Sequence, residues 1–424
     1  MPTTKNKFTK IPTQNLKIQI NGEIYNTNTL KKEINTNQKL TNEQILEKLI
    51  KKHTQLNKKN LKNTLKKIDG DYTITITNNT ETILIRDPIG TKPLYYSTEN
   101  TLKYATQPKT LIKKNLKNIQ TLKPGHLLYK NKQHLIYNLF ENTQPSNKTY
   151  TQLTDEIINT LYTSTYQRTK NQKNIGLLCS GGIDSAFIAY ILKNITKTNK
   201  KNITLYAVGN KNSKDLKYSK KIAENLNLPL KIQKVNKETI KKILPTVIIA
   251  TETTNNMKLG VASTIYLATK LMKQDQQKTA IAGQGADELF AGYNRYIKHI
   301  ENNTPEKLQE ELIHDLKNMH HVNLERDYAA STQNQIQLKL PYLSNNMIKL
   351  ALKIPIKYKI KSKEDKLKKH ILRDAATKYG VPEEISQRPK KAAQYGSGID
   401  KIIKKKLQIE MNFEEILTQY YNDN

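Results

Sequence analysis

Residues 175–185 constrain this chain more than any other stretch, because they place two adjacent glycines between a strand and a helix. The apolar run IGLLC has the length and composition of a buried strand. It stops at SGG (180–182), and DSA (184–186) opens an apolar, helix-like segment, AFIAYILKNI. Two glycines let the backbone approach a ligand closely, and a helix N-terminus adds unpaired N–H donors. The stretch therefore predicts a nest for phosphate or pyrophosphate, with an ordinary strand-to-helix turn as the alternative.

A second glycine-bearing turn follows a second expected buried strand, at residues 279–282. It reads AGQGADELFAGY, with glycines on both sides of Gln284 and two acidic residues, Asp287 and Glu288, where a helix should begin. If both loops lie at neighbouring strand ends, Asp184 and Asp287 share one Mg²⁺ ion, because hard oxygen ligands suit that ion. The alternative for either aspartate alone is a helix N-cap.

The order of the expected elements divides the chain into domains at 1–145 and 150–424. Residues 15–140 are mostly short strands, such as the alternating DYTITIT, with helical spacing at 42–53. A polar link, ENTQPSNKTY at about 141–150, comes next. From residue 151 strands such as Asn202–Gly209 alternate with helices, and the chain is largely helical after about residue 307. This alternation predicts a doubly wound parallel sheet with a ligand at the carboxyl ends of its strands.

Composition narrows the classes of partner. The net charge is +34, but only six of the 71 basic residues are arginines, and the lysines are spread along the whole chain. Recognition of nucleic acid favours arginine clusters and interleaved aromatics, so we weigh against a nucleic-acid partner. Cys179 is the only cysteine, which excludes an internal disulfide and a CxxC site. With no apolar run of about 18 residues and no secretory signal at the start, we expect no membrane span and a cytoplasmic protein.

Further motifs, in a fixed order along the chain, make a resemblance to a known family specific. RDYAAS, LPYLS, KHILRDAA and RPKK follow SGGIDS and GQGADELFAGY, and the ordered set resembles the synthetase domain of asparagine synthetases. Upstream, NGEIYN, RDPIGTKPLYY and LKPGH resemble the class II glutamine amidotransferase domain of that family. The resemblance covers about residues 15–400. It implies an α/β protein: a truncated, Ntn-type antiparallel β-sandwich remnant, then an ATP pyrophosphatase (adenine nucleotide α-hydrolase-like) domain with a helical C-terminal part.

The resemblance also implies a reaction. ATP activates the side-chain carboxylate of aspartate as an acyl-adenylate, pyrophosphate leaves, and ammonia then yields asparagine and AMP. Mg²⁺ is implied at Asp184 and Asp287, and catalytic roles at Lys390, Gln284 and Asp287. Lys390 would neutralise charge that grows on the phosphates, although it also reads as one more lysine of a Lys-rich tail. The residues implied for ATP and pyrophosphate are Leu178, Ser180, Gly181, Gly182, Asp184, Ser185, Val208 and Gly283.

The glutaminase half departs from the family pattern. Pro2 stands where the family has its N-terminal cysteine nucleophile, and the arginine-bearing segment that binds the glutamine carboxylate is absent. Asn42 and Gln44 read as replacements of two substrate-binding carboxylates, whereas Asn21 and Gly22 resemble surviving oxyanion-hole donors. Without a thiolate there is no covalent glutamyl intermediate. We therefore expect an inactive glutaminase site, with free ammonia or a separate glutaminase as the nitrogen source.

The second loop departs as well. Gln284 stands where the family usually has the glutamate of SGEG, and glutamine cannot accept a proton at neutral pH. β-Lactam synthetases and macrolactam cyclases, which act on other substrates, alter the same loop. Three alternatives therefore stay open: a related synthetase acting on another carboxylate, a tRNA-modifying ATP pyrophosphatase, and a non-catalytic binding protein. The oligomeric state, a homodimer included, is open too.

Overall fold

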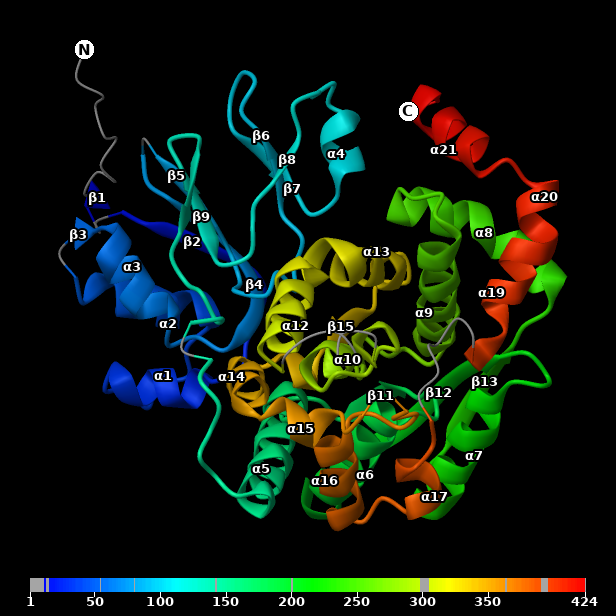
Figure 1. Ribbon diagram of the computed structural model, residues 1–424. Helices are drawn as coiled ribbons and strands as arrows, with labels where there is room; N and C mark the ends of the chain where they lie inside the picture. The colour runs from blue at the N-terminus through cyan, green and yellow to red at the C-terminus, as the bar shows by residue number, and fades with distance from the viewer. Residues whose placement is uncertain are drawn as a thin grey trace. The chain divides into compact units, whose positions relative to one another are not determined.

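The structure is a computed structural model, and the chain forms two compact units, Met1–Glu141 and Asn142–Asn424 (Figure 1). The division of the chain between residues 141 and 142 falls within the polar link at about 141–150. Each unit has a sheet and a hydrophobic core of its own. The structure describes residues 11–12, 15–53, 55–79, 81–141, 143–199, 201–297, 305–362, 364–389 and 396–423.

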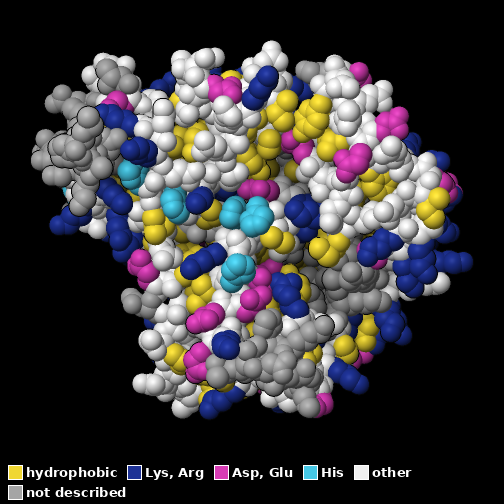
Figure 2. Space-filling view, turned by 45° about the horizontal axis from the view of Figure 1, so that its top comes forward, with side chains coloured by type: hydrophobic (Ala, Val, Ile, Leu, Met, Phe, Trp, Pro, Cys, Tyr) yellow, Lys and Arg dark blue, Asp and Glu magenta, His cyan; other side chains and the backbone are white. Residues whose placement is uncertain are grey.

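On the face shown in Figure 2, basic side chains (dark blue) are scattered, with acidic ones (magenta) between them. Ion pairs such as Lys51–Glu47 and Lys378–Asp155 join side chains that are largely exposed. Exposed pairs of this kind contribute only about 0–1 kcal/mol each, so packing rather than surface charge holds the fold. No helix in the described part of the chain has the length and apolarity to cross a membrane.

The N-terminal unit is mainly antiparallel β-structure. Its strands are β1 (Ile11–Pro12), β2 (Lys17–Ile24), β3 (Gln55–Leu56), β4 (Gly70–Thr77), β5 (Thr82–Arg86), β6 (Tyr95–Ser97), β7 (Lys103–Ala105), β8 (Gln120–Thr121), β9 (His126–Tyr129) and β10 (Lys132–Leu135). Five of them form an antiparallel sheet in the order β10-β9-β5-β4-β2. A second antiparallel sheet has the order β7-β6-β8, and β1 pairs with β3.

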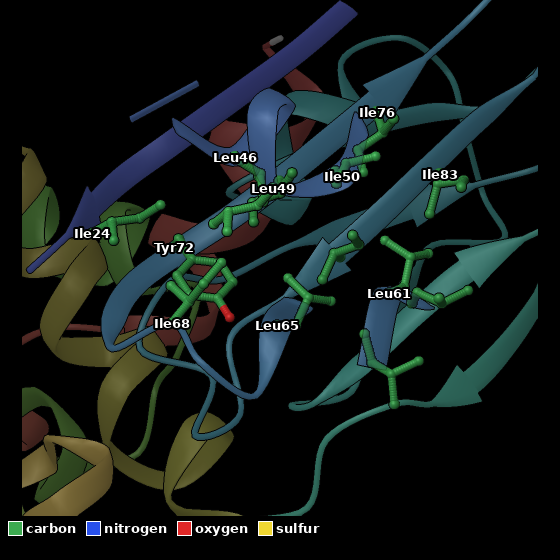
Figure 3. Close-up of a cluster of buried hydrophobic side chains, with 14 of the residues drawn as sticks. Ile24, Leu46, Leu49, Ile50, Leu61, Leu65, Ile68, Tyr72, Ile76 and Ile83 are labelled. Atoms are coloured by element: carbon green, nitrogen blue, oxygen red, sulfur yellow. The ribbon is translucent and has the colours of Figure 1, made fainter. Parts of the chain in front are cut away.

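Helices cover one face of the five-stranded sheet. They are α1 (Thr27–Glu33), α2 (Asn42–Lys51) and α3 (Lys58–Leu65), which contribute to the same buried cluster as the sheet. The short helix α4 (Pro108–Ile112) lies beside β6 and β7. Side chains alternate along β5: Ile83 and Ile85 enter the buried cluster with Leu46 of α2 and Leu61 of α3 (Figure 3). Leu84, between them, faces the other way and packs with Tyr96 of β6. The two antiparallel sheets therefore pack on each other, as the predicted sandwich remnant requires.

The C-terminal unit contains a five-stranded parallel sheet in the order β13-β12-β11-β14-β15. The strands are β11 (Asn174–Leu178), β12 (Asn202–Gly209), β13 (Leu230–Lys234), β14 (Thr279–Ile281) and β15 (Gln337–Lys339). The chain builds outward from β11 to β13 and then returns to the other side of β11 with β14. The strand order thus reverses between β11 and β14, which is where ligands bind in doubly wound sheets.

Helices pack on both faces of this sheet, with α6 and α7 along one side and α9 along the other (Figure 1). The helices are α5 (Tyr150–Thr169), α6 (Ile183–Asn199), α7 (Lys214–Leu226), α8 (Lys237–Thr251), α9 (Asn256–Gln274), α10 (Ala286–Leu289), α12 (Pro305–Met319), α13 (Glu325–Thr332), α14 (Asn345–Lys353), α15 (Ile356–Lys359), α16 (His370–Lys378), α17 (Glu383–Ser386), α19 (Ile399–Ile402), α20 (Gln408–Glu410) and α21 (Phe413–Asn422), with π-helical turns η1 (His320–Leu324) and η3 (Ile403–Leu407) and the 3₁₀ turn η2 (Pro341–Leu343). The doubly wound sheet and the helical C-terminal part confirm the predicted fold class.

Candidate active site

A pocket of about 410 Å³ opens at the carboxyl ends of β11 and β14, at the switch point of the C-terminal unit. Nearly all of the nucleotide and loop residues named from the sequence line it. They are Leu178, Ser180, Gly182, Asp184, Ser185, Val208, Gly283, Gln284 and Asp287. Val261 and Ile265 of α9 extend the apolar wall that Leu178 and Val208 begin. The pocket therefore has an apolar flank beside a rim of loop backbone and carboxylates, a combination typical of small-molecule sites.

The first loop needs its glycine. Gly181 has a φ of +67°, and a Cβ there would lie 2.7 Å from Cβ of Tyr218 and 2.8 Å from Nη1 of Arg388. Any side chain at this position is both strained and obstructed. After the loop, Ser185 Oγ donates to the carbonyl of Gly182 at 3.1 Å, in the first turn of α6. The first-turn N–H groups of α6 are thus presented beside the pocket, where an anion is stabilised.

The two glycine-bearing loops touch. A Cβ on Gly283 would lie 3.0 Å from Cβ of Asp184, so the second loop packs directly on the start of α6. Gly285, with a φ of +95°, turns the chain into α10 and lies against Leu343 of η2. Tyr342 OH donates to the carbonyl of Asp184 at 3.3 Å. Because β11 also pairs with β14, both loops lie at neighbouring strand ends, which is the condition set from the sequence for a shared Mg²⁺ ion.

Lys369 lies between the two aspartates at the ends of these loops. Its Nζ is 2.7 Å from Oδ1 of Asp184, 2.8 Å from Oδ2 of Asp184 and 2.7 Å from Oδ1 of Asp287. The lysine side chain is fully buried. Burial lowers the pKa of Lys369, but the two carboxylates outweigh it and raise that pKa above its ordinary value. A single ammonium thus compensates two carboxylates that face one point.

The backbone at Lys369 is strained. Lys368 and Lys369 have φ values of 55° and 56°, in the left-handed region that residues with a Cβ seldom occupy. Arg373 of α16 holds this turn, donating at 2.7 Å to the carbonyls of both Leu367 and Lys368. It also donates to the carbonyl of Arg388 at 2.9 Å. Strain held in place by surrounding contacts is typical of functional positions.

The pair Asp184–Asp287 fits a divalent cation of the Mg²⁺ type. Its carboxylates are hard oxygen ligands that already converge on a positive charge, the Lys369 ammonium. Among the residues that the structure describes, no cluster of three or more His, Cys, Asp or Glu side chains is placed to hold a metal. Mg²⁺ commonly binds one or two carboxylates and completes its shell with phosphate oxygens and water, so two carboxylates suffice.

Arg388 fixes the outer side of the first loop. Its guanidinium lies 4.4 Å from the ring centroid of Tyr218, and its Nη1 donates to the carbonyl of Ser180 at 3.2 Å. Its Nη2 pairs with Asp215 Oδ1 at 2.5 Å, and both side chains are only 7% exposed. The sequence singled out Arg388 only as part of the RPKK motif. Lys390 of that motif, for which a catalytic role is predicted, lies outside the described residues.

The part of the pocket lined by Gln284, Glu288 and Arg326 is polar. Gln284 donates its amide to Asp327, and Arg326 pairs with the same carboxylate at 2.7 Å. Glu288, 3% exposed, accepts from Tyr293 OH at 2.7 Å and from Asn323 Nδ2 at 2.9 Å. The π-helical turn η1 supplies Asn323 and precedes the turn of α13 that carries Arg326. π-Helical turns are often found at functional sites, and no sequence pattern announced this one.

Asp327, Arg326, Arg373 and Arg388 were named from the sequence only as parts of motifs and were given no role, but a signal for the arginines was available. Four of the six arginines of the chain line this pocket: Arg295, Arg326, Arg373 and Arg388. In a chain that otherwise uses lysine for positive charge, a retained arginine indicates a site that needs a planar, multivalent donor.

The residues named for the glutaminase site lie in the N-terminal unit. Asn21 and Gly22 are on β2, and Gly22 has a φ of +130°, with a Cβ position only 1.9 Å from the carbonyl oxygen of Asp71. Asn42 is the first residue of α2. The side chain of Gln44 closes a capping box with Thr41, so helix capping also accounts for it. Pro2 lies outside the described residues.

The single cysteine is not available as a nucleophile. Cys179 directly follows β11 and is 3% exposed, and burial raises the pKa of its thiol. Nucleophilic cysteines have a lowered pKa and an accessible sulfur. The expectation of a buried cysteine in the strand region of the second domain is confirmed.

A parallel sheet with glycine loops and paired aspartates at its switch point is an α/β domain with a candidate ligand site at the carboxyl ends of its strands. The asparagine synthase family model matches residues 156–306 and 298–412, and a glutamine amidotransferase domain model matches residues 9–162. A Methanocaldococcus jannaschii protein, whose name assigns it to the glutamine-hydrolyzing asparagine synthetases, is 31% identical over 91% of this chain and 78% of its own. The chain belongs to the asparagine synthase family.

More distant relatives are longer than this chain. Asparagine synthetase (glutamine-hydrolyzing) 1 of Lotus japonicus is 24% identical over 90% of this chain, which spans 66% of that relative. Among solved structures, NMN synthetase from Francisella tularensis aligns with 64% of this chain and 85% of its own, at 16% identity and a TM-score of 0.32. A TM-score of this size carries no argument about site or activity.

Proposed function

We propose that the chain is an ATP-dependent amide-forming ligase that adenylates the side-chain carboxylate of aspartate, releases pyrophosphate and forms asparagine and AMP with ammonia. One observation carries the proposal: Asp184 and Asp287 converge on the Lys369 ammonium beside the Gly181 loop, at the switch point of a parallel sheet. This arrangement offers oxygen ligands, N–H donors and a buried cation within one pocket. Membership of the asparagine synthase family supports the same reaction type.

Each part of ATP finds matching chemistry in the pocket. The apolar wall at Leu178 and Val208 suits the flat face of an adenine ring. The N–H groups that begin α6 suit the phosphates. Asp184 and Asp287 would hold Mg²⁺, which when bound would screen the negative charge of the pyrophosphate.

We propose that side chains of this chain contribute to catalysis by holding positive charges and hydrogen-bond donors in fixed positions. Arg388 and Arg373 fix the loops that surround the phosphates, so their donors need little reorganisation as charge develops. Lys390 is proposed from the sequence alone as a further cation for the leaving pyrophosphate. Arg326 also lines the pocket, and we propose that it binds a carboxylate of the acceptor acid.

Ammonia, rather than glutamine, is the proposed nitrogen donor. Cys179, the only cysteine in the sequence, is buried and has a raised thiol pKa. A glutaminase of this family type needs a reactive thiolate. We propose that ammonia comes from solution or from a separate glutaminase, and that the partners of the chain are small molecules rather than nucleic acid.

A related acceptor is the second candidate. Gln284, which lines the pocket, stands where the family usually has a glutamate. This difference in the second loop is the one observation that supports a ligase of the same mechanism that acts on another carboxylic acid.

Pyrophosphate release tests both candidates. Purified protein is supplied with ATP, Mg²⁺, ammonium and one carboxylic acid at a time, with aspartate first. We expect aspartate-dependent pyrophosphate and AMP in equal amounts, and their loss in Asp184→Asn and Asp287→Asn. Release with a different acid would identify the second candidate, whereas full activity in both variants would remove the proposed site.

A further inference from the structure

We propose that Asp327 is a positioning residue that turns the amide oxygen of Gln284 into the pocket, where it accepts an N–H of the attacking ammonia or amine. The contact that carries this inference is between Nε2 of Gln284 and Oδ2 of Asp327. The identity of the nucleophile rests on the proposed function, but the contact itself does not.

The orientation of the Gln284 amide follows from hydrogen-bond chemistry. An ionised carboxylate only accepts, so the amide nitrogen, not the oxygen, must face Asp327. The amide oxygen then points away from Asp327. It has no hydrogen-bond partner among the residues that the structure describes, and Gln284 lines the pocket. A preset acceptor therefore faces the space where the acceptor acid and the nucleophile would meet.

Asp327 is held rigidly enough for this task. Its side chain is 1% exposed, and its Oδ1 accepts from Nε of Arg326 at 2.8 Å and pairs with Nη2 at 2.7 Å. Burial raises the pKa of Asp327, while the adjacent Arg326 and the Gln284 amide oppose that rise. The three side chains together carry no net charge, so the burial of the carboxylate is compensated.

The arrangement also explains why position 284 carries no carboxylate. A glutamate there would lie against the buried Asp327 carboxylate, and both would compete for Arg326. One carboxyl group would have to take up a proton or move away. Gln284 and Asp327 thus form a matched pair in which only position 327 is charged. An amide oxygen takes up no proton at neutral pH, so this position orients the nucleophile by accepting a hydrogen bond rather than by acting as a base.

A double-mutant cycle of thermal stability tests the Gln284–Asp327 contact and requires no measurement of enzyme activity. Wild type, Gln284→Glu, Asp327→Asn and the double variant are unfolded thermally at pH 8 and at pH 5. We expect Gln284→Glu to lower the Tm at pH 8 by about 3–8 °C and to lower it less at pH 5, because acid favours the protonation of one of two adjacent carboxyl groups and so relieves their repulsion. The double variant, which exchanges the two groups, should regain at least half of the loss at pH 8. The inference would be overturned if Gln284→Glu left the Tm unchanged, or if the Tm loss of the double variant equalled the sum of the losses of the two single variants.

Kinetics test the nitrogen-binding role. Asp327→Asn should raise the KM for ammonium about tenfold and leave the KM for ATP within about twofold, because the side chains that Asp327 holds, Gln284 and Arg326, are assigned to the nucleophile and the acceptor acid rather than to ATP. In the exchanged double variant the new carboxylate should shift the pH profile for ammonium. Asp71→Asn is the matched control: a buried carboxylate of the N-terminal unit that accepts from Tyr25 OH, whose loss should lower stability only. Equal rises in both KM values would make Asp327 merely structural. If the wild type forms no amide from ammonium, the proposed function and the nitrogen-binding role fail together, while the stability cycle still decides the contact.

Discussion

Two buried lysines of the C-terminal unit should respond oppositely to the same substitution. Lys369 and Lys359 are both fully buried. Lys369 contacts two carboxylates, whereas Nζ of Lys359 has no hydrogen-bond partner among the residues that the structure describes. Methionine keeps most of the volume of lysine and removes its charge. We therefore expect Lys369→Met to destabilise the protein and Lys359→Met to stabilise it.

The loss at Lys369 can be estimated from its contacts. Removing one partner of a buried ion pair costs about 3–5 kcal/mol. The side chains of Asp184 and Asp287 are 21% and 19% exposed, so water compensates part of their charge. We expect a loss near the lower end, about 3 kcal/mol, or about 6–12 °C in Tm. Added Mg²⁺ should reverse part of it, because the two carboxylates then regain a cation.

The gain at Lys359 depends on pH. Burial lowers the pKa of Lys359 from 10.5 to about 7. That difference corresponds to about 5 kcal/mol as an upper limit, of which we expect about 1–3 kcal/mol to be recovered with methionine. Because folding lowers this pKa, the penalty is complete below pH 7, fades as the pH rises towards 10.5, and is absent above it. The advantage of Lys359→Met should therefore shrink between pH 7 and pH 10.

The assay is urea unfolding at pH 7 and pH 9.5, with and without Mg²⁺. The chain has no tryptophan and 23 tyrosines, so far-UV circular dichroism and tyrosine fluorescence are the suitable signals. Destabilisation of similar size by both substitutions would refute the reasoning, because it would mean that Lys359 also has a compensating charge in the folded protein.

Three further outcomes are expected. Gly181→Ala should lower pyrophosphate release at least tenfold and reduce stability, because the added Cβ meets Tyr218 and the guanidinium of Arg388; thermal unfolding beside the kinetic assay checks this, and wild-type values in both would contradict it. Lys390→Ala should lower turnover by a factor of about 10² with ATP binding nearly unchanged, since charge compensation matters most in the transition state; equal losses in affinity and rate, measured by ATP titration and steady-state kinetics, would leave only a structural role. Finally, the purified chain should release no glutamate from glutamine while ammonium supports amide formation, because Cys179 is buried; glutamate production at the rate of amide formation would reverse this reading.

The sequence predicted the elements that depend on local pattern. The strand and glycine loop at 175–182, the helix that follows, and the second loop at 282–288 all lie where the spacing indicates. The strand β15 was not predicted from the sequence, because it has only three residues, Gln337–Lys339, with polar residues at both ends. Strands this short have too little alternation to stand out from loops. The parallel partner β14 stabilises it, and that partner is distant in sequence.

The composition of the site was less predictable than its position. KHILR reads as the start of an amphipathic helix, and nothing local indicates that Lys369 reaches two aspartates far away along the chain. The same holds for Asp327, which meets Gln284 only because α13 packs near the second loop. In the other unit, Gln44 read as a lost carboxylate, although its side chain closes the capping box of α2. Tertiary contacts decide such roles, so a motif locates a site better than it assigns the partners in it.

The arginines show which positive charges have a structural or functional task. Arg86 donates to the carbonyls of Lys92, Leu122 and Gly90 at 2.7–2.9 Å. Arg373 makes a similar set of bonds beside the pocket. A lysine has a single ammonium on a flexible stem and cannot bridge several carbonyls in one plane. The net charge of +34 is therefore carried mainly by interchangeable surface lysines, whereas the electrostatics of the site depend on the few side chains that a lysine, or a different carboxylate, could not replace.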